Sequence, residues 1–214
     1  MSTHHSLVVS ALVAVLLVCS PTADARQRQC DAASLGEPGP DYQRRVERLH
    51  RELGIPRDYG EQAGLELQPE NRQRVTAWID EGQGVFYMSR EARRAWYRMN
   101  AAAIMDGVVL TLVSAYRPLE RQAMIVRERL EQGQAIEDIL ETSAAPGYSE
   151  HHTGDAIDLN TRDTEPFSRD FAQTEAYKWL EDNASRFCFE LSYPKDNGKT
   201  VRFEPWHWRF QRGA

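Results

Sequence analysis

The sequence lacks two features that would define its partners directly: a hydrophobic run long enough to cross a membrane, and a surplus of positive charge. Its apolar stretch near the N-terminus, residues 7–18, is shorter than the roughly 20 residues that a transmembrane helix needs. The 26 basic residues are outnumbered by 32 acidic ones, for a formal net charge of -6. This balance argues against nucleic acid or an anionic membrane surface as a partner. Internal repeats and low-complexity tracts are also lacking.

The short apolar stretch is typical of a cleaved signal peptide. Ala23-Asp24-Ala25 follows it and puts small residues at the two positions that a signal peptidase reads. We therefore expect an exported protein, periplasmic or extracellular, with no membrane insertion after cleavage. The rest of the chain suffices for one domain of normal core size but hardly for two. The expected organisation is a signal peptide at 1–25, an arm rich in glycine and proline at 26–41, and a single, monomeric domain at 42–214.

Cysteine is scarce, with three residues in the chain. Cys19 would leave with the signal peptide, so that Cys30 and Cys188 remain as an even pair in an oxidising compartment. A disulfide between them would tie the N-terminal arm to the core. Two unpaired thiols are the alternative, because proximity cannot be read from sequence.

Two short segments, residues 149–158 and 204–207, hold the side chains that a catalytic zinc site needs. His151, Asp158 and His207 would supply two imidazole nitrogens and one carboxylate oxygen. Catalytic zinc takes three protein ligands and keeps a fourth position for water, whose pKa it lowers to about 7. Glu204 remains free to act as a base. The pattern therefore predicts a zinc hydrolase.

The residues around the first two ligands predict how the chain presents them. Gly154 permits a tight turn, and residues 156–159 alternate in the manner of a short strand. Ile157 and Leu159 would then face the core, while Asp158 faces the opposite side.

The spacing of Glu204 and His207 needs a different explanation. Residues three apart lie on opposite faces of a regular strand, so we expect Pro205 to introduce a bend that brings both side chains to one cavity. Taken singly, a histidine is more often a core or surface residue and a glutamate a solvated charge. The joint pattern is what favours a metal site.

Three blocks of sequence extend this pattern: Ser114-Ala-Tyr-Arg-Pro-Leu-Glu-Arg-Gln122, residues 146–158 (PGYSEHHTGDAID) and Glu204-Pro-Trp-His-Trp-Arg209. Their order and composition resemble the VanY-type zinc D-alanyl-D-alanine carboxypeptidases, in the group that shares its fold with the Hedgehog signalling domain. The resemblance implies zinc ligands at His151, Asp158 and His207, a general base and acid at Glu204, and substrate-site residues at Arg117, Gln122, Ser149 and Trp206.

The position of Arg117 agrees with this resemblance. It follows an apolar, β-branched run at 108–116 that predicts a buried strand, so Arg117 emerges at a strand end, where sites are commonly built. Arginine offers a permanently charged fork that can bind a free carboxylate or stabilise an oxyanion. His152 falls where relatives often carry glutamine, and we expect it at the rim of the site.

Hydrophobic periodicity predicts an α+β domain with a small, mainly antiparallel sheet and helices packed around it, like the Hedgehog/DD-peptidase fold. Residues 60–84 are expected to be irregular, with one short helix near 72–79. The other expected elements are helices at 42–53, 90–106 with Ser89 as N-cap, 119–131, 135–141 and 172–186, a strand at 108–115, and a hairpin of 187–193 and 201–210 joined by Asp196-Asn197-Gly198.

Chemistry and resemblance together predict a zinc-dependent D,D-carboxypeptidase that removes terminal D-alanine from peptidoglycan stem peptides. An L,D-carboxypeptidase or a peptidoglycan endopeptidase of the same group would use the same residues. From a different class, a non-catalytic wall-binding module is the alternative. Glu204 argues against that module, because binding needs no base.

Overall fold

The computed structural model describes residues 30–80, 82 and 84–213. The expected signal peptide and the first residues of the arm lie outside this part of the chain. Residues 31–39 form neither helix nor strand. No helix in the described part is both long and apolar enough to cross a membrane.

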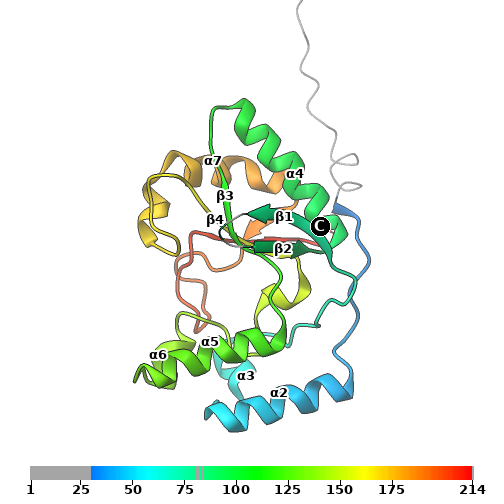
Figure 1. The fold of residues 1–214 in the computed structure, drawn as a ribbon, viewed down its shortest axis with the longest axis vertical. Coiled ribbons are helices and arrows are strands. Elements are labelled where there is room, and N and C mark those ends of the chain that lie inside the picture. Colours follow the sequence, from blue (N-terminus) through cyan, green and yellow to red (C-terminus); the bar gives the residue numbers. More distant parts are fainter. Residues whose placement is uncertain (1–29, 81, 83, 214) are drawn as a thin grey trace, which may run out of the picture.

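A four-stranded antiparallel sheet lies at the centre of the fold (Figure 1). β4 is buried along its whole length because it is flanked by strands on both sides and covered on both faces. The expected small antiparallel sheet is thus confirmed. In spatial order the strands are β3 (Thr111–Ser114), β4 (Ala156–Asn160), β6 (His207–Phe210) and β5 (Phe189–Leu191).

The helices form two groups, and each group has its own hydrophobic cluster (Figure 1). The first group packs on the sheet itself, and the second forms a separate cluster beside it. The first contains α4 (Arg90–Met105), α7 (Glu175–Asn183) and the short 3-10 helices η2 (Arg169–Gln173) and η3 (Ala184–Phe187); the second contains α2 (Pro40–Leu53), α3 (Tyr59–Ala63), α5 (Leu119–Glu131) and α6 (Ile136–Leu140).

The helix predictions agree closely with the structure where the caps could be read from the sequence. Ser89 caps α4, since its hydroxyl accepts a hydrogen bond from the amide of Ala92 at 3.1 Å. The single helix expected at 172–186 is divided into α7 and two 3-10 turns. The division occurs because Thr174 is extended and caps α7 through the amide of Tyr177.

One prediction for the strands was wrong, and another was confirmed only in part. Residues 60–84 contain α3 and the strand β1 (Val75–Asp80), which pairs with β2 (Gly84–Met88) as an antiparallel ribbon. The residues of β1 are rich in β-branched and aromatic types, and pairing buries Ala77 and Met88 against the core. The expected hairpin of 187–193 and 201–210 is reduced to β5 and β6, with a long loop at 192–206 between them.

A disulfide joins Cys30 to Cys188, with their Cα atoms 5.6 Å apart and 158 positions apart in sequence. The expected pairing is confirmed. Nearby, the guanidinium of Arg212 donates to the carbonyl of Ala33 at 2.8 Å. The N-terminal arm is therefore tied covalently to the residue that precedes β5 and by a hydrogen bond to the C-terminal segment.

Loss of this disulfide should lower stability markedly. We expect the Cys30→Ser, Cys188→Ser double variant to lose about 3 to 5 kcal/mol of unfolding free energy, because cross-linking so long a loop restricts the unfolded chain. That loss corresponds to a fall in Tm of about 10 °C for a domain of this size. Calorimetry of the oxidised wild type and the variant measures it, and the reduced wild type should match the variant. Equal Tm values for oxidised and reduced protein would contradict the expectation.

Candidate metal centre

The three predicted ligands meet in the structure because of strand register. Asp158 on β4 lies directly opposite His207 on β6, and His151 lies in the 3-10 turn η1 (Glu150–Thr153) that leads into β4. One Asp158 oxygen is 3.1 Å from Nε2 of His151, and the other is 2.9 Å from Nδ1 of His207. All three residues are buried, and their ligand atoms lie within 4.8 Å of one another, so that they could hold a metal ion.

The turn between the first two ligands requires glycine, as expected. Gly154 has φ +72°, and a Cβ added there would lie 2.8 Å from the backbone nitrogen of Ser89. Its amide donates to the carbonyl of His151, and its carbonyl accepts from the amide of Ser89. The turn is thus held against the start of α4, and this contact fixes the position of His151 relative to β4.

Hydrogen bonds behind the two imidazoles determine which nitrogen faces the metal. Nδ1 of His151 donates to the carbonyl of Ala115 at 2.7 Å, so its Nε2 points toward Asp158. Nε2 of His207 donates to Glu150 at 3.0 Å, so its Nδ1 points toward Asp158. Such outer contacts fix the tautomer and the ring orientation of metal-binding histidines.

Glu150 is a functional residue that the sequence analysis missed. Its carboxylate is buried and pairs with both His207 and Arg209, each at 3.0 Å. Arg209 also donates to Gln68 at 3.0 Å. Although burial opposes ionisation, the contacts with His207 and Arg209 hold the pKa of Glu150 well below its ordinary value. The sequence contained a signal for this pair. The acidic Glu150 directly precedes the predicted ligand His151, and the basic Arg209 lies two residues after the predicted ligand His207, on the same face of the strand.

The two carboxylates beside His207 favour the protonated form of its imidazole. Burial alone would lower the pKa of its imidazole, but the hydrogen bonds with Asp158 and Glu150 outweigh burial and raise that pKa to about 10. A metal at Nδ1 must displace this proton, and metal affinity at such sites therefore falls as pH falls.

Glu204 lies beside the ligands without joining them. A turn closed by the hydrogen bond from the amide of His207 to the carbonyl of Glu204 confirms the expected bend, and the Glu204 carboxylate lies 4.0 Å from Nδ1 of His207. Burial raises the pKa of Glu204 to about 7. A carboxylate with such a pKa is suited to accept and return a proton near neutral pH.

Arg117 lies just beyond the end of β3, as predicted, and its guanidinium is held in place by neighbours. It donates to Gln122 at 2.7 Å and to Ser114 at 3.0 Å, and it lies 3.7 Å from Asp158. The amide nitrogen of Gln122 in turn donates to Ser143 and to the carbonyl of Ala144. Both polar atoms of the Gln122 side chain thus form hydrogen bonds within the protein, and Gln122 positions Arg117 in the cavity.

The expectation that His152 lies at the rim was wrong. Its side chain is fully buried, where Nδ1 donates to the carbonyl of Arg117 at 2.7 Å and Nε2 accepts from the amide of Gly147 at 3.0 Å. Burial lowers the pKa of His152 to about 4, so the imidazole stays neutral and can both donate and accept. His152 thus links the backbone at Arg117 to the turn that holds His151.

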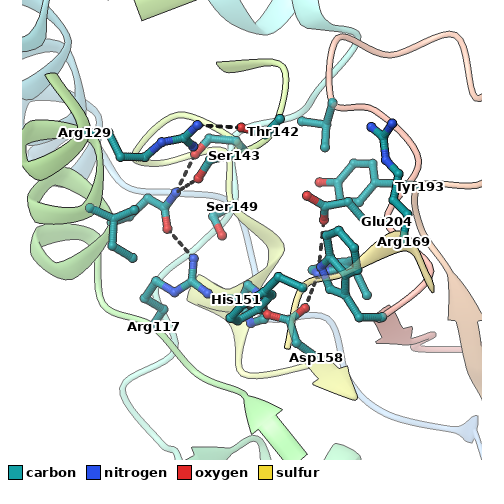
Figure 2. Close-up of a pocket in the computed structure, with 17 residues that line it drawn as sticks. Arg117, Arg129, Thr142, Ser143, Ser149, His151, Asp158, Arg169, Tyr193 and Glu204 are labelled. Atoms are coloured by element: carbon teal, nitrogen blue, oxygen red, sulfur yellow. Dashed lines mark hydrogen bonds and ion pairs between the residues drawn. The ribbon is translucent and has the colours of Figure 1, made fainter. Parts of the chain in front are cut away.

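The three predicted ligands, Glu204 and Arg117 face one cavity of about 540 Å³ (Figure 2), within the range typical of small-ligand sites. The predicted site residues Ser149 and Trp206 line it, as do Arg117, Gln122 and the three ligands. Sequence reasoning did not find the other walls, which come from loops and from the end of α5. They include Arg129, Thr142, Ser143, Phe167, Arg169 and Tyr193.

Comparison with known proteins identifies the family. The model of the VanY D-alanyl-D-alanine carboxypeptidases matches residues 85–213, and the chain belongs to this family. It is 34% identical over 119 residues to a D-alanyl-D-alanine carboxypeptidase of Enterococcus faecalis; the match covers 51% of this chain and 42% of that relative. The chain thus spans less than half the length of that relative.

Solved structures confirm the expected fold. The LD-carboxypeptidase LdcB has a TM-score of 0.60 at 30% identity, over 68% of this chain and 71% of that one. VanYB in complex with D-Ala-D-Ala has a TM-score of 0.51 at 30% identity, over 67% of this chain and 81% of that one.

Removing one ligand should abolish metal binding. We expect wild-type protein to bind about one zinc ion per chain and His207→Ala to bind far less, because two remaining ligands hold zinc weakly. Metal analysis after dialysis measures this, with circular dichroism to establish that the variant is folded. An unchanged zinc content in a folded His207→Ala protein would contradict the ligand assignment.

Glu150 should strengthen zinc binding through its hydrogen bond with His207. We expect Glu150→Gln to weaken zinc binding about ten- to a hundredfold, because His207 loses its charged acceptor. Competition with a chromophoric chelator measures the Kd. Glu141→Gln, which removes a surface acid that pairs with Arg202, serves as the control and should leave the Kd unchanged. Equal affinities in the two variants would contradict this role for Glu150.

Proposed function

We propose that this protein is a zinc-dependent D,D-carboxypeptidase that removes terminal D-alanine from peptidoglycan stem peptides. The observation that carries the proposal is the partly buried Glu204 carboxylate, 4.0 Å from His207 and on the same cavity as a complete set of candidate ligands and Arg117. Membership of the VanY family supports the substrate class. The similarity to VanYB, whose structure contains D-Ala-D-Ala, supports it further.

The metal would be held by His151, Asp158 and His207. Two imidazoles and a carboxylate suit zinc, and three protein ligands are the usual number in its catalytic sites. When bound there, zinc supplies a Lewis acid that polarises a carbonyl oxygen and lowers the pKa of water to about 7.

The protein's own residues supply the remaining steps. Glu204 accepts the proton of the attacking water and passes it to the leaving amine, and its pKa of about 7 suits both transfers. Arg117 stabilises negative charge on the scissile carbonyl oxygen or on the substrate carboxylate, since Gln122 and Ser114 already hold its guanidinium in place.

An L,D-carboxypeptidase is the second candidate, and one observation favours it. The LD-carboxypeptidase LdcB matches this structure with a TM-score of 0.60, and the same catalytic residues would serve either reaction. A peptidoglycan endopeptidase would also use them. A non-catalytic wall-binding module is not favoured, because it has no use for a base at Glu204.

We further infer that the protein acts outside the cytoplasm. The disulfide between Cys30 and Cys188 supports this location, because such bonds persist in oxidising compartments. A peptidoglycan substrate and the apolar stretch at 7–18 point the same way.

Replacing the base should separate chemistry from metal binding. We expect Glu204→Gln to retain zinc and to lower kcat about a hundred- to ten-thousandfold, because proton transfer is lost. Release of D-alanine from a peptide ending in D-Ala-D-Ala is the assay, and Glu190→Gln, at an exposed position of β5, is the matched control. A Glu204→Gln enzyme with wild-type kcat would contradict the mechanism.

Substrate variants test the specificity in the same assay. A D,D-carboxypeptidase should cleave the free acid and fail on the C-terminal amide. Release of D-alanine only from a peptide with an L-residue before the terminal D-alanine would instead establish the L,D reaction. Equal cleavage of acid and amide would point to an endopeptidase.

A further inference from the structure

Positive charge remains unneutralised in the outer part of the cavity. Figure 2 shows Arg129 and Arg169 on opposite sides, away from Asp158. The acidic residues that line the cavity, Asp158 and Glu204, are both engaged at the metal end. The outer part therefore has two cationic walls and no acidic lining residue among those that the structure describes.

Arg129, in the last turn of α5, is held by neutral partners. Its Nε donates to Gln134 and one of its terminal nitrogens donates to Thr142, each at 2.9 Å. No acidic side chain in the described part of the chain forms an ion pair with it. Burial lowers the pKa of this guanidinium, with no carboxylate nearby to compensate. A half-buried cation that is positioned but unpaired is ready to receive an anion.

Arg169, at the start of η2, faces Arg129 from the other wall. It is exposed, and its side chain has no hydrogen-bond or ion-pair partner among the residues that the structure describes. A shallow groove shares Arg169 with the cavity and is also lined by Lys195 and Lys199, two of the three lysines in the chain, and by one acidic residue, Asp196. The positive charge of this wall thus continues beyond the cavity.

The loop that carries Arg169 also has a strained backbone. Phe167 has φ 63°, a left-handed conformation that is unfavourable for a bulky side chain. Its ring is about half exposed and meets Trp206 edge to face at a centroid distance of 6.0 Å. Strained residues of this kind cluster at ligand-binding positions. Phe167 adds an apolar surface between the metal end and Arg169.

We propose that Arg129 and Arg169 form an anion-binding subsite for a second carboxylate, one that the peptide substrate carries on the acyl side of the scissile bond. This inference rests on the proposed function. A carboxypeptidase places a single residue on the leaving side, so the acyl part of the peptide must occupy the outer cavity and leave through its mouth. The substrate class is therefore a peptide with a free acidic side chain before its terminal D-Ala-D-Ala, in preference to its amidated counterpart.

A matched pair of peptides tests the subsite. Both end in D-Ala-D-Ala, and the preceding residue carries a free carboxylate in one and a carboxamide in the other. We expect the wild type to prefer the acid about tenfold in kcat/KM, which is the usual scale for one charge-assisted hydrogen bond. Arg129→Gln and Arg169→Gln should each reduce this preference by raising KM for the acid more than KM for the amide. Arg129→Lys should retain part of it.

Arg127→Gln is the matched control. Arg127 lies on α5 and pairs with Glu52 at 3.8 Å, outside the cavity, so its replacement changes the net charge equally and should leave the preference intact. Equal loss on both peptides in Arg129→Gln and Arg169→Gln would overturn the subsite.

Binding measurements separate this proposal from the catalytic one. Calorimetry of the two peptides with zinc-loaded Glu204→Gln protein reports the preference without turnover. If the wild type cleaves neither peptide but the variant binds the acid about tenfold more tightly, the proposed reaction fails and the subsite stands. If the wild type cleaves both peptides equally well and binding is equal, the subsite fails and the reaction stands.

Discussion

The pairing of β4 with β6 is the constraint on which the site depends. It places Asp158 directly opposite His207, so that one carboxylate contacts both histidines of the ligand set. Adjacent antiparallel strands hold opposite side chains about 4.5 to 5.5 Å apart at Cβ, close enough for two ligands to share one ion. A shift of one strand by one residue in this register would turn one of the two side chains to the other face. The metal site is thus a consequence of the sheet, and only His151 depends on a separate turn.

Buried charge at this centre is balanced in two layers. In the inner layer, Asp158 contacts the two histidines and Arg117. In the outer layer, Glu150 pairs with His207 and Arg209. Each carboxylate that burial would otherwise destabilise has a charged partner, and removal of one partner would leave an uncompensated charge. The same contacts orient the rings. Electrostatic balance and ligand geometry are therefore provided by the same few residues.

Sequence reasoning was informative where chemistry or caps left a local signal. The structure brings the predicted ligands together with Glu204, residues that their types and spacing had singled out, and it confirms α4, for which Ser89 is a strong N-cap. Glu150 and His152 were missed or misplaced because their roles depend on partners distant in sequence: Arg209, and the backbone of Arg117. The ribbon of β1 and β2 was missed because its stability comes from pairing and from burial of Ala77 and Met88, which short strands do not reveal locally.

The cavity divides into an inner end fixed by the sheet and an outer mouth built from loops and a helix end. The inner groups are tied to one another through hydrogen bonds, so a substitution there disturbs several contacts at once. Arg129 is held only by Gln134 and Thr142, and Arg169 has no described partner at all. Because Arg129 and Arg169 make so few contacts, they can be substituted without disturbing the geometry of the metal site. Variation in substrate preference among proteins with this fold is therefore expected to arise at the mouth, while the hydrolytic chemistry remains at the strand pair.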